Sequence, residues 1–230
     1  MNWNIETLEK FELNKIANLE SKQKIADKIV DKVKDGQVIG FGSGSTSYLA
    51  TIAIANKIRK ENIHILAVPT SIEIKMLCAN LGIATTSLFA NKPDWSFDGA
   101  DEVDKSNWLI KGRGGAMFKE KLNIANSKIT YILIDNSKKV EKLCTKHKIP
   151  VECCIDSVNY VKERLQELGG IDIALRKAEG KDGPIITENG NLILDVKFEN
   201  ITNNLEKEIK SITGVVESGL FIGYNVEIIS

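Results

Sequence analysis

The sequence predicts an α/β fold, in which a parallel sheet forms one domain and a smaller α+β domain is inserted near its carboxyl-terminal end. Three observations support this prediction. Short, nearly all-apolar segments alternate with helical segments up to about residue 146, a pattern typical of a parallel sheet with covered faces. The following residues have the order βαββαβ, and a last apolar run at 225–229 can rejoin the first sheet. We therefore expect domains of residues 1–146 plus 222–230 and of residues 147–221.

The first domain begins with a helical region over residues 4–35, in one or two helices, that ends at Asp35-Gly36. Within it, apolar residues recur between Lys22 and Lys34 with the 3.6-residue period of an amphipathic helix. Further helices are expected over 47–59, 72–81 and 116–126. Strands are expected over 38–41, 63–68, 83–88, 95–97, 108–110 and 129–134.

The second domain has strands expected over 150–155 and 171–176, with a helix over 157–168 between them. Residues 184–187 and 192–198 flank Glu-Asn-Gly-Asn, which is a strong hairpin signal. A helix over 202–212 and a strand over 215–221 complete the βαββαβ order, which is that of a ferredoxin-like domain.

The composition is that of a soluble globular protein. Hydrophobic residues make up 43% of the 230 residues, and the 31 acidic residues balance the 31 basic ones. We expect neither a nucleic-acid nor a membrane partner, because no net charge would attract an anionic polymer or surface and no apolar run could span a bilayer. The first fifteen residues contain acids and no apolar core, unlike a signal peptide, so the expected location is the cytoplasm.

The cysteines and histidines indicate neither a disulfide framework nor a metal site. No C-x-x-C motif is present and two cysteines are adjacent, so we expect reduced, mostly buried thiols. His64 and His147 lack a Cys/His ligand spacing around them, and no metal or other cofactor is expected. The four cysteines are Cys78, Cys144, Cys153 and Cys154.

A glycine- and hydroxyl-rich loop follows the first strand, in the segment GFGSGST at residues 40–46. Ser45 occupies the place of the third glycine of a dinucleotide fingerprint, and the lysine of a Walker loop is absent. The glycines and hydroxyls of this loop suit a phosphate monoester. The amides of the turn, which includes Gly44, and the hydroxyls of Ser43, Ser45 and Thr46 can bind it. The alternative is a tight turn without a ligand.

Two carboxylates follow another strand, in the segment Asp98-Gly99-Ala100-Asp101. Ligands of open α/β sheets bind beyond the carboxyl ends of the strands, so these acids can bind sugar hydroxyls. A metal is less attractive because no histidine accompanies them. They can equally be a solvated capping pair, and Glu102 and Asp104 are expected to be exposed.

A lysine, an arginine and three glycines precede the next helix, in the segment Lys111-Gly112-Arg113-Gly114-Gly115. Glycines let a substrate approach bare N–H groups, and the lysine can stabilise an oxyanion. Glu120, early in that helix, is either a general base or a surface residue between two lysines. Lys138, after the strand at 129–134, is either a phosphate ligand or an exposed charge.

These motifs together resemble the A-type ribose-5-phosphate isomerase family. The resemblance extends from about Lys22 to the end of the chain and includes two departures, since Ser43 replaces a threonine of many members and Arg113 a glycine of some. The motifs that carry it are GFGSGST, PTS, DGADEVD, KGRGGAMFKEK, ENGNLILDV and GVVESGLF.

The resemblance implies a Rossmann-like domain with an inserted ferredoxin-like domain, and metal-free interconversion of D-ribose 5-phosphate and D-ribulose 5-phosphate in the pentose phosphate pathway. It implies that Glu120 accepts the proton and that residues 43–46, 98–101 and 111–114, with Lys138, contact the sugar phosphate. Asp98, Asp101 and Lys111 would assist catalysis. A homodimer, or a homotetramer built from two dimers, is expected from the same resemblance.

Other functions remain open from the residues. A related sugar-phosphate enzyme, such as an amino-sugar-phosphate deaminase, would use a similar set of groups. A non-enzymatic sugar-phosphate sensor could retain the pocket, but no basic helix-turn-helix candidate precedes the first strand. A nicotinamide-dependent oxidoreductase is disfavoured by the missing third glycine and by Val68-Pro69 where an acid should end the second strand.

Overall fold

The computed structural model of the chain describes residues 16–230 and contains two compact units. Unit 1 comprises the residues up to Gly99 together with Asn126–Asp135 and Val226–Ser230, and unit 2 comprises Ala100–Ala125 and Asn136–Asn225. The chain therefore passes between the units several times, and each unit is described by itself.

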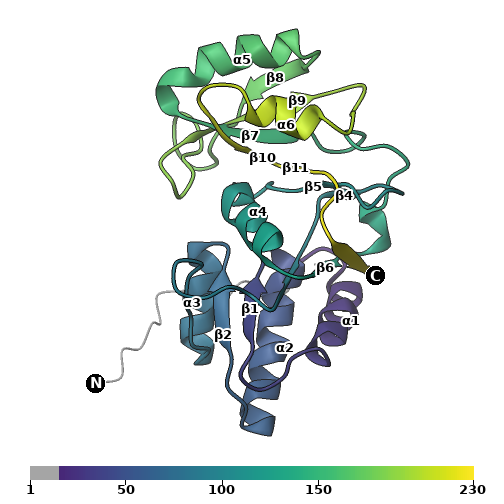
Figure 1. Cartoon of the computed structure of the whole chain (residues 1–230), viewed down its shortest axis with the longest axis vertical. Helices are drawn as coiled ribbons and strands as arrows, with labels where there is room; N and C mark the ends of the chain where they lie inside the picture. The colour runs from purple at the N-terminus through teal and green to yellow at the C-terminus, as the bar shows by residue number, and fades with distance from the viewer. Residues whose placement is uncertain (1–15) are drawn as a thin grey trace. The chain divides into compact units, whose positions relative to one another are not determined.

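Unit 1 contains a five-stranded sheet in which all strands are parallel, with the order β12-β6-β3-β1-β2. Helices α1, α2 and α3 pack beside it (Figure 1). The last strand, β12, pairs with β6, which confirms that the end of the chain rejoins the first sheet. The bounds are α1 (Leu19–Val30), β1 (Val38–Phe41), α2 (Ser45–Glu61), β2 (Leu66–Pro69), α3 (Ile72–Leu81), β3 (Trp95–Asp98), β6 (Thr130–Leu133) and β12 (Val226–Ile229).

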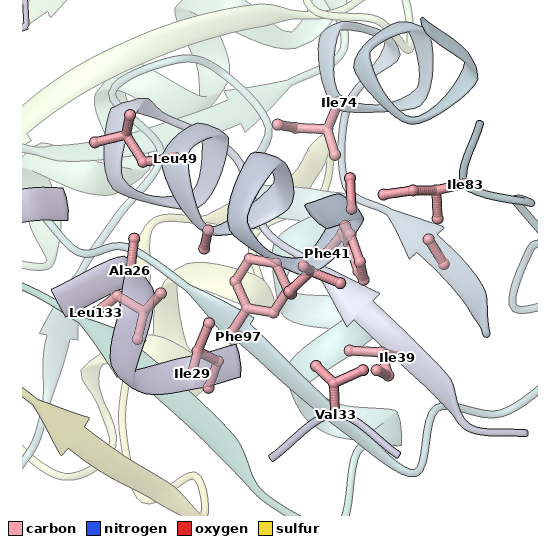
Figure 2. Packing of buried hydrophobic residues seen from close by; sticks show 14 of the residues in the cluster. Ala26, Ile29, Val33, Ile39, Phe41, Leu49, Ile74, Ile83, Phe97 and Leu133 are labelled. Atoms are coloured by element: carbon pink, nitrogen blue, oxygen red, sulfur yellow. The ribbon is translucent and has the colours of Figure 1, made fainter. Parts of the chain in front are cut away.

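The core of unit 1 lies between the central strands and the helices. Phe41 of β1 and Phe97 of β3 are fully buried, and their ring centroids are 4.8 Å apart. Ile29 of α1 packs into the same cluster, and Figure 2 shows it near the two rings. Because large aromatic side chains dominate the energetics of a core, this contact fixes the ends of β1 and β3 beside each other.

Unit 2 contains a four-stranded antiparallel sheet with the order β10-β7-β9-β8. Along the chain its elements alternate as βαββαβ, so the ferredoxin-like prediction is confirmed. Both helices contribute to one apolar cluster with β7 and β9, for example through Val161 and Ile209. The bounds are β7 (Ile149–Cys153), α5 (Val158–Glu167), β8 (Ile171–Leu175), β9 (Leu192–Lys197), α6 (Leu205–Lys210) and β10 (Val215–Ser218).

A second, three-stranded sheet of unit 2 has the order β11-β5-β4. The expected single strand over 215–221 is divided at Gly219 between this sheet and the four-stranded one. A Cβ at Gly219 would lie 2.1 Å from the carbonyl oxygen of Lys111, so the chain crosses there where no side chain fits. The remaining elements are β4 (Glu102–Val103), β5 (Leu109–Ile110), α4 (Met117–Asn126), β11 (Leu220–Phe221) and the 3₁₀ turns η2 (Asn136–Lys138) and η3 (Ile155–Ser157).

The two units divide the chain differently from the domains expected from the sequence. Residues 100–125 and 136–146 belong to unit 2, because β4 and β5 form a sheet with β11 and because Lys121 of α4 binds Glu206 and Glu217. The division into domains of residues 1–146 plus 222–230 and of residues 147–221 stays a prediction.

Some predicted elements are wrong in detail. Residues 83–88 form no strand, since only Thr85 makes an isolated bridge, to Ala67. Residues 184–187 do not pair with 192–198, because Thr187–Asn191 is a turn whose side chains bind Glu152, while β9 pairs with β7 and β8. The part of the expected first helix before residue 16 lies outside the described residues.

The helices of residues 16–230 are all too short or too polar to cross a membrane.

Candidate active site

The glycine- and hydroxyl-rich loop connects β1 to α2 in unit 1. Because α2 has seventeen residues and no acidic residue in its first turn, its amino-terminal amides and dipole present positive potential at the loop. Ser43 and Ser45 are half-buried and Thr46 is buried. The loop therefore has the donors that an anionic group needs, as the sequence predicts.

The loop is in contact with Asp98 at the end of β3. One Asp98 carboxylate oxygen, Oδ1, accepts hydrogen bonds from the amides of Ser43, at 3.2 Å, and Gly99, at 2.7 Å. The side chain is only 3% exposed, so the hypothesis of a solvated capping pair is wrong for Asp98. The amide bonds stabilise the buried carboxylate and fix its orientation beside the loop.

Two further side chains, which are not among the predicted site residues, bind the loop. The ammonium of Lys22, on α1, donates to Ser45 Oγ at 3.0 Å. The hydroxyls of Ser43 and Thr70 are 2.6 Å apart. Lys22 adds a positive charge to a loop that is otherwise neutral, and only its position within an amphipathic helix could be recognised from the sequence.

A buried ion pair forms the centre of the second group of site residues, in unit 2. Lys111 follows β5 and Glu120 lies on α4, and Lys111 Nζ is 3.4 Å from Glu120 Oε2. Their side chains are 2% and 6% exposed. Removing two charges from water is unfavourable unless they interact closely, so this pair indicates a functional requirement more than a gain in stability.

The Lys-Glu-Lys triplet at residues 119–121 is only partly exposed. Lys119 reaches the surface and pairs with Glu188. Lys121 is buried and pairs with Glu206 at 2.6 Å and Glu217 at 3.0 Å. Only one of the three side chains is thus oriented toward solvent, and the hypothesis that Glu120 is a surface residue is wrong.

The loop between Lys111 and α4 holds Asp101 by its backbone. The amide of Arg113 donates to Asp101 Oδ2 at 3.2 Å. Gly112 has φ +89°, a left-handed conformation that glycine adopts without strain, and a Cβ there would lie 2.9 Å from Met117. Arg113 and Gly114 are exposed, and Asp101 is half-buried.

The remaining predicted residues are less strongly positioned. Gly99 and Ala100 are half-buried and connect Asp98 to Asp101. Lys138 ends the 3₁₀ turn η2 and is half-buried. Among residues 16–230, no three histidine, cysteine, aspartate or glutamate side chains are clustered as metal ligands would be.

Comparison with known proteins shows the family of the chain. The model of the family described as ribose 5-phosphate isomerase A (phosphoriboisomerase A) matches residues 66–230. Ribose-5-phosphate isomerase A of Methanocaldococcus jannaschii is 44% identical over 209 residues, which are 90% of this chain and 92% of that protein. The chain belongs to the ribose-5-phosphate isomerase A family.

Solved structures of ribose-5-phosphate isomerases also superpose closely. The structure from Methanocaldococcus jannaschii has a TM-score of 0.89 and 41% identity, over 93% of this chain and 96% of that one. A D-ribose-5-phosphate isomerase in complex with phospho-erythronic acid has a TM-score of 0.88 and 34% identity, with the same coverage of both chains. These likenesses confirm the Rossmann-like domain with its ferredoxin-like insertion.

One acid of the family motif DGADEVD has a different role from the one expected. Glu102 is fully buried, whereas the sequence suggests that it is exposed. Its carboxylate accepts hydrogen bonds from the amides of Thr145, Lys146 and His147. Glu102 thus supplies hydrogen-bond acceptors to the backbone amides of residues 145–147. The place of an acid in the motif does not tell whether it is buried and structural or exposed.

Proposed function

We propose that the protein interconverts D-ribose 5-phosphate and D-ribulose 5-phosphate, with Glu120 as the base that moves the proton between C2 and C1. The buried pair of Lys111 and Glu120 carries this proposal. One carboxylate can remove the C2 proton of the aldose, and the same group can return it to C1, through an enediolate.

The charges of the pair match the charge movement of this reaction. Before proton transfer the carboxylate of Glu120 is negative and the ammonium of Lys111 positive, at 3.4 Å. After proton transfer Glu120 is neutral and the negative charge lies on the enediolate oxygen, where Lys111 can stabilise it. No net charge is created in a buried environment, which is where isolated charge is least stable.

The two aspartates act on the sugar rather than on the travelling proton. Asp98 assists opening of the cyclic sugar, for which its buried carboxylate is oriented by two amides. Asp101 binds a sugar hydroxyl, and the amides of Gly112 and Gly114 donate to the developing oxyanion. Ala100 and Gly99 contribute backbone contacts to the same sugar phosphate.

The phosphate is bound far along the substrate from the reacting carbons. Its ligands are the loop residues 43–46, helped by the ammonium of Lys22 and by Lys138. Binding energy from a remote group serves catalysis by positioning the reacting atoms, so losses here should raise KM more than they lower kcat.

We also propose that the protein is a cytoplasmic enzyme of the non-oxidative pentose phosphate pathway and forms a homodimer or a dimer of dimers. Family resemblance supports each of these statements. Light scattering of the purified protein measures the assembly size directly.

Replacing Glu120 by glutamine tests the proposed base. We expect kcat to fall by about 10²–10⁴-fold in both directions, because glutamine cannot accept the proton. Phospho-erythronic acid, a phosphorylated four-carbon sugar acid, should still bind, since its binding requires no proton transfer. Coupled assays and titration calorimetry provide the two readouts.

Glu163→Gln on α5 is the matched control, because Glu163 is exposed and belongs to no part of the proposed site. It should retain the wild-type kcat. A Glu120→Gln variant with near-normal kcat, at equal folded fraction, would show that another group is the base. Wild-type protein inactive on ribose 5-phosphate would refute the proposed substrate.

A further inference from the structure

The loop that opens α4 is fixed by a side chain from another element of unit 2. Arg176 immediately follows β8, and its Nη1 donates to the carbonyl oxygens of Gly112, at 3.0 Å, and Arg113, at 2.8 Å. Arg176 lies outside every sequence motif of the site.

The guanidinium is itself held in place by Asp195 of β9. Nε donates to Asp195 Oδ2 at 2.8 Å, and Nη2 donates to Oδ1, so the pair is bidentate. The side chains of Arg176 and Asp195 are only 14% and 23% exposed. A planar guanidinium fixed along one edge presents its remaining N–H groups in a defined direction, which an ammonium cannot do.

The carbonyl contacts determine the direction of the loop amides. In a trans peptide the N–H points opposite to the C=O. The peptide joining Gly112 to Arg113 therefore has Arg176 at its oxygen and Asp101 at its N–H, where the distance to Oδ2 is 3.2 Å. The next peptide is held by the same guanidinium at the Arg113 oxygen, so its N–H, that of Gly114, also points away from Arg176.

We propose that Arg176 is a positioning residue of the isomerisation. It holds two successive peptides so that the Arg113 amide orients Asp101 and the Gly114 amide is presented to the substrate. The loop contains three glycines, which would otherwise allow its peptides to turn over. This inference rests on the proposed function, and it adds a residue just after β8 that does not touch the substrate.

Arg176→Gln and Arg176→Lys test the inference. Both should lower kcat by about 10–100-fold with KM changed by less than about threefold, because a misdirected amide weakens binding of the transition state more than of the substrate. The lysine variant keeps the positive charge but not the planar set of N–H donors, so it should not restore activity. Arg164→Gln, at the surface pair with Glu167 on α5, is the control and should behave as wild type.

Hydrogen exchange gives a readout that does not depend on turnover. In both Arg176 variants the amides of residues 112–116 should exchange faster than in the wild type, while those of α5 remain unchanged. Wild-type kcat in Arg176→Gln, full activity in Arg176→Lys, or unchanged exchange of the loop would each overturn the inference. Wild-type protein inactive on ribose 5-phosphate would refute the proposed function instead, and the exchange data would still decide whether Arg176 holds the loop.

Discussion

At the scale of single residues, Gly42 and Asp98 approach each other closely in the site. A Cβ at Gly42 would lie 2.3 Å from Asp98 Cγ and 2.5 Å from its Cα, which is too close for any adjustment by the side chain alone. The absence of a side chain at Gly42 is thus what allows Asp98 to lie beneath the loop between β1 and α2. A glycine in a motif is often attributed to the ligand, but here a neighbouring side chain explains it.

Gly42→Ala should therefore damage both stability and activity. We expect unfolding to become easier by about 1–3 kcal/mol or more, because the ends of β1 and β3 must separate, and kcat to fall as Asp98 is displaced. Gly36→Ala is the control: its φ is +76° but its Cβ would meet no atom within 4 Å, so it measures backbone strain alone, about 1–2 kcal/mol. Thermal unfolding of the two variants, with assays, separates the effects; equal losses would contradict the steric account.

The Lys111–Glu120 pair allows stability and activity to be separated. Lys111→Met leaves a buried carboxylate without its cation and should lower stability by about 3–5 kcal/mol. Adding Glu120→Gln removes the uncompensated charge, so the double variant should recover much of that loss while staying inactive. Chemical denaturation measures the first quantity and the coupled assay the second. A double variant as unstable as Lys111→Met would mean that packing, not charge, explains the loss.

The role of a residue could be predicted where residue type and spacing indicate it, but not where it depends on burial in the folded chain. The position of Lys111 and Glu120 around a glycine loop suggested a base and an oxyanion partner. Burial distinguishes Glu120 from Lys119 but not from Lys121, which is buried too and pairs with Glu206 and Glu217. The full burial of Glu102 likewise indicates a structural role that its place in the motif does not reveal. Lys22 and Arg176 carried no local signal, because each reaches the site residues from a distant part of the chain.

At the scale of elements, two adjacent cysteines at the end of β7 differ in their exposure to solvent. Cys153 is fully buried within β7, whereas Cys154, the next residue, is exposed. Burial raises the pKa of the Cys153 thiol to about 11 and that of the Cys78 thiol to about 12. Burial likewise raises the pKa of Cys144. All four thiols are free, so their accessibility decides their reactivity.

A thiol reagent at pH 8 should therefore modify one cysteine of the native protein rapidly and four after denaturation. A raised pKa means that the buried thiols stay protonated at pH 8, and the thiolate is the reactive form. Cys154→Ser should abolish the rapid phase. Mass spectrometry of the labelled protein identifies the site, and rapid labelling at Cys78 would contradict the burial described for α3.

Elements were predictable where a strand or helix is long and regular, and less so at connections. The helix over 72–81 and the strand over 38–41 were expected with the bounds observed. The run at 215–221 looks like one strand, yet it contributes to two sheets because the chain crosses the Lys111 carbonyl at Gly219. The turn at Thr187–Asn191 was expected to join two paired strands, but its polar side chains bind Glu152 instead.

At the scale of the whole molecule, the sequence predicts the two kinds of sheet correctly but not the assignment of every segment to a unit. Alternating apolar segments identify the parallel sheet, and the βαββαβ order identifies the antiparallel one. Residues 100–125 and 136–146 follow the parallel-sheet pattern along the chain but make their sheet pairing and ion pairs with the later part of the sequence. Such long-range contacts are invisible to local periodicity.

The pairing of β12 with β6 bears on how the protein is made. Synthesis proceeds from the amino terminus, so β6 emerges from the ribosome while its neighbour at residues 226–229 does not yet exist. Until then β6 is an open sheet edge, with unpaired backbone groups that can recruit another chain. All of residues 136–225 are translated during that interval. A nascent chain stalled before β12 should therefore be prone to aggregation and a substrate for chaperones, although its loop between β1 and α2 is already complete.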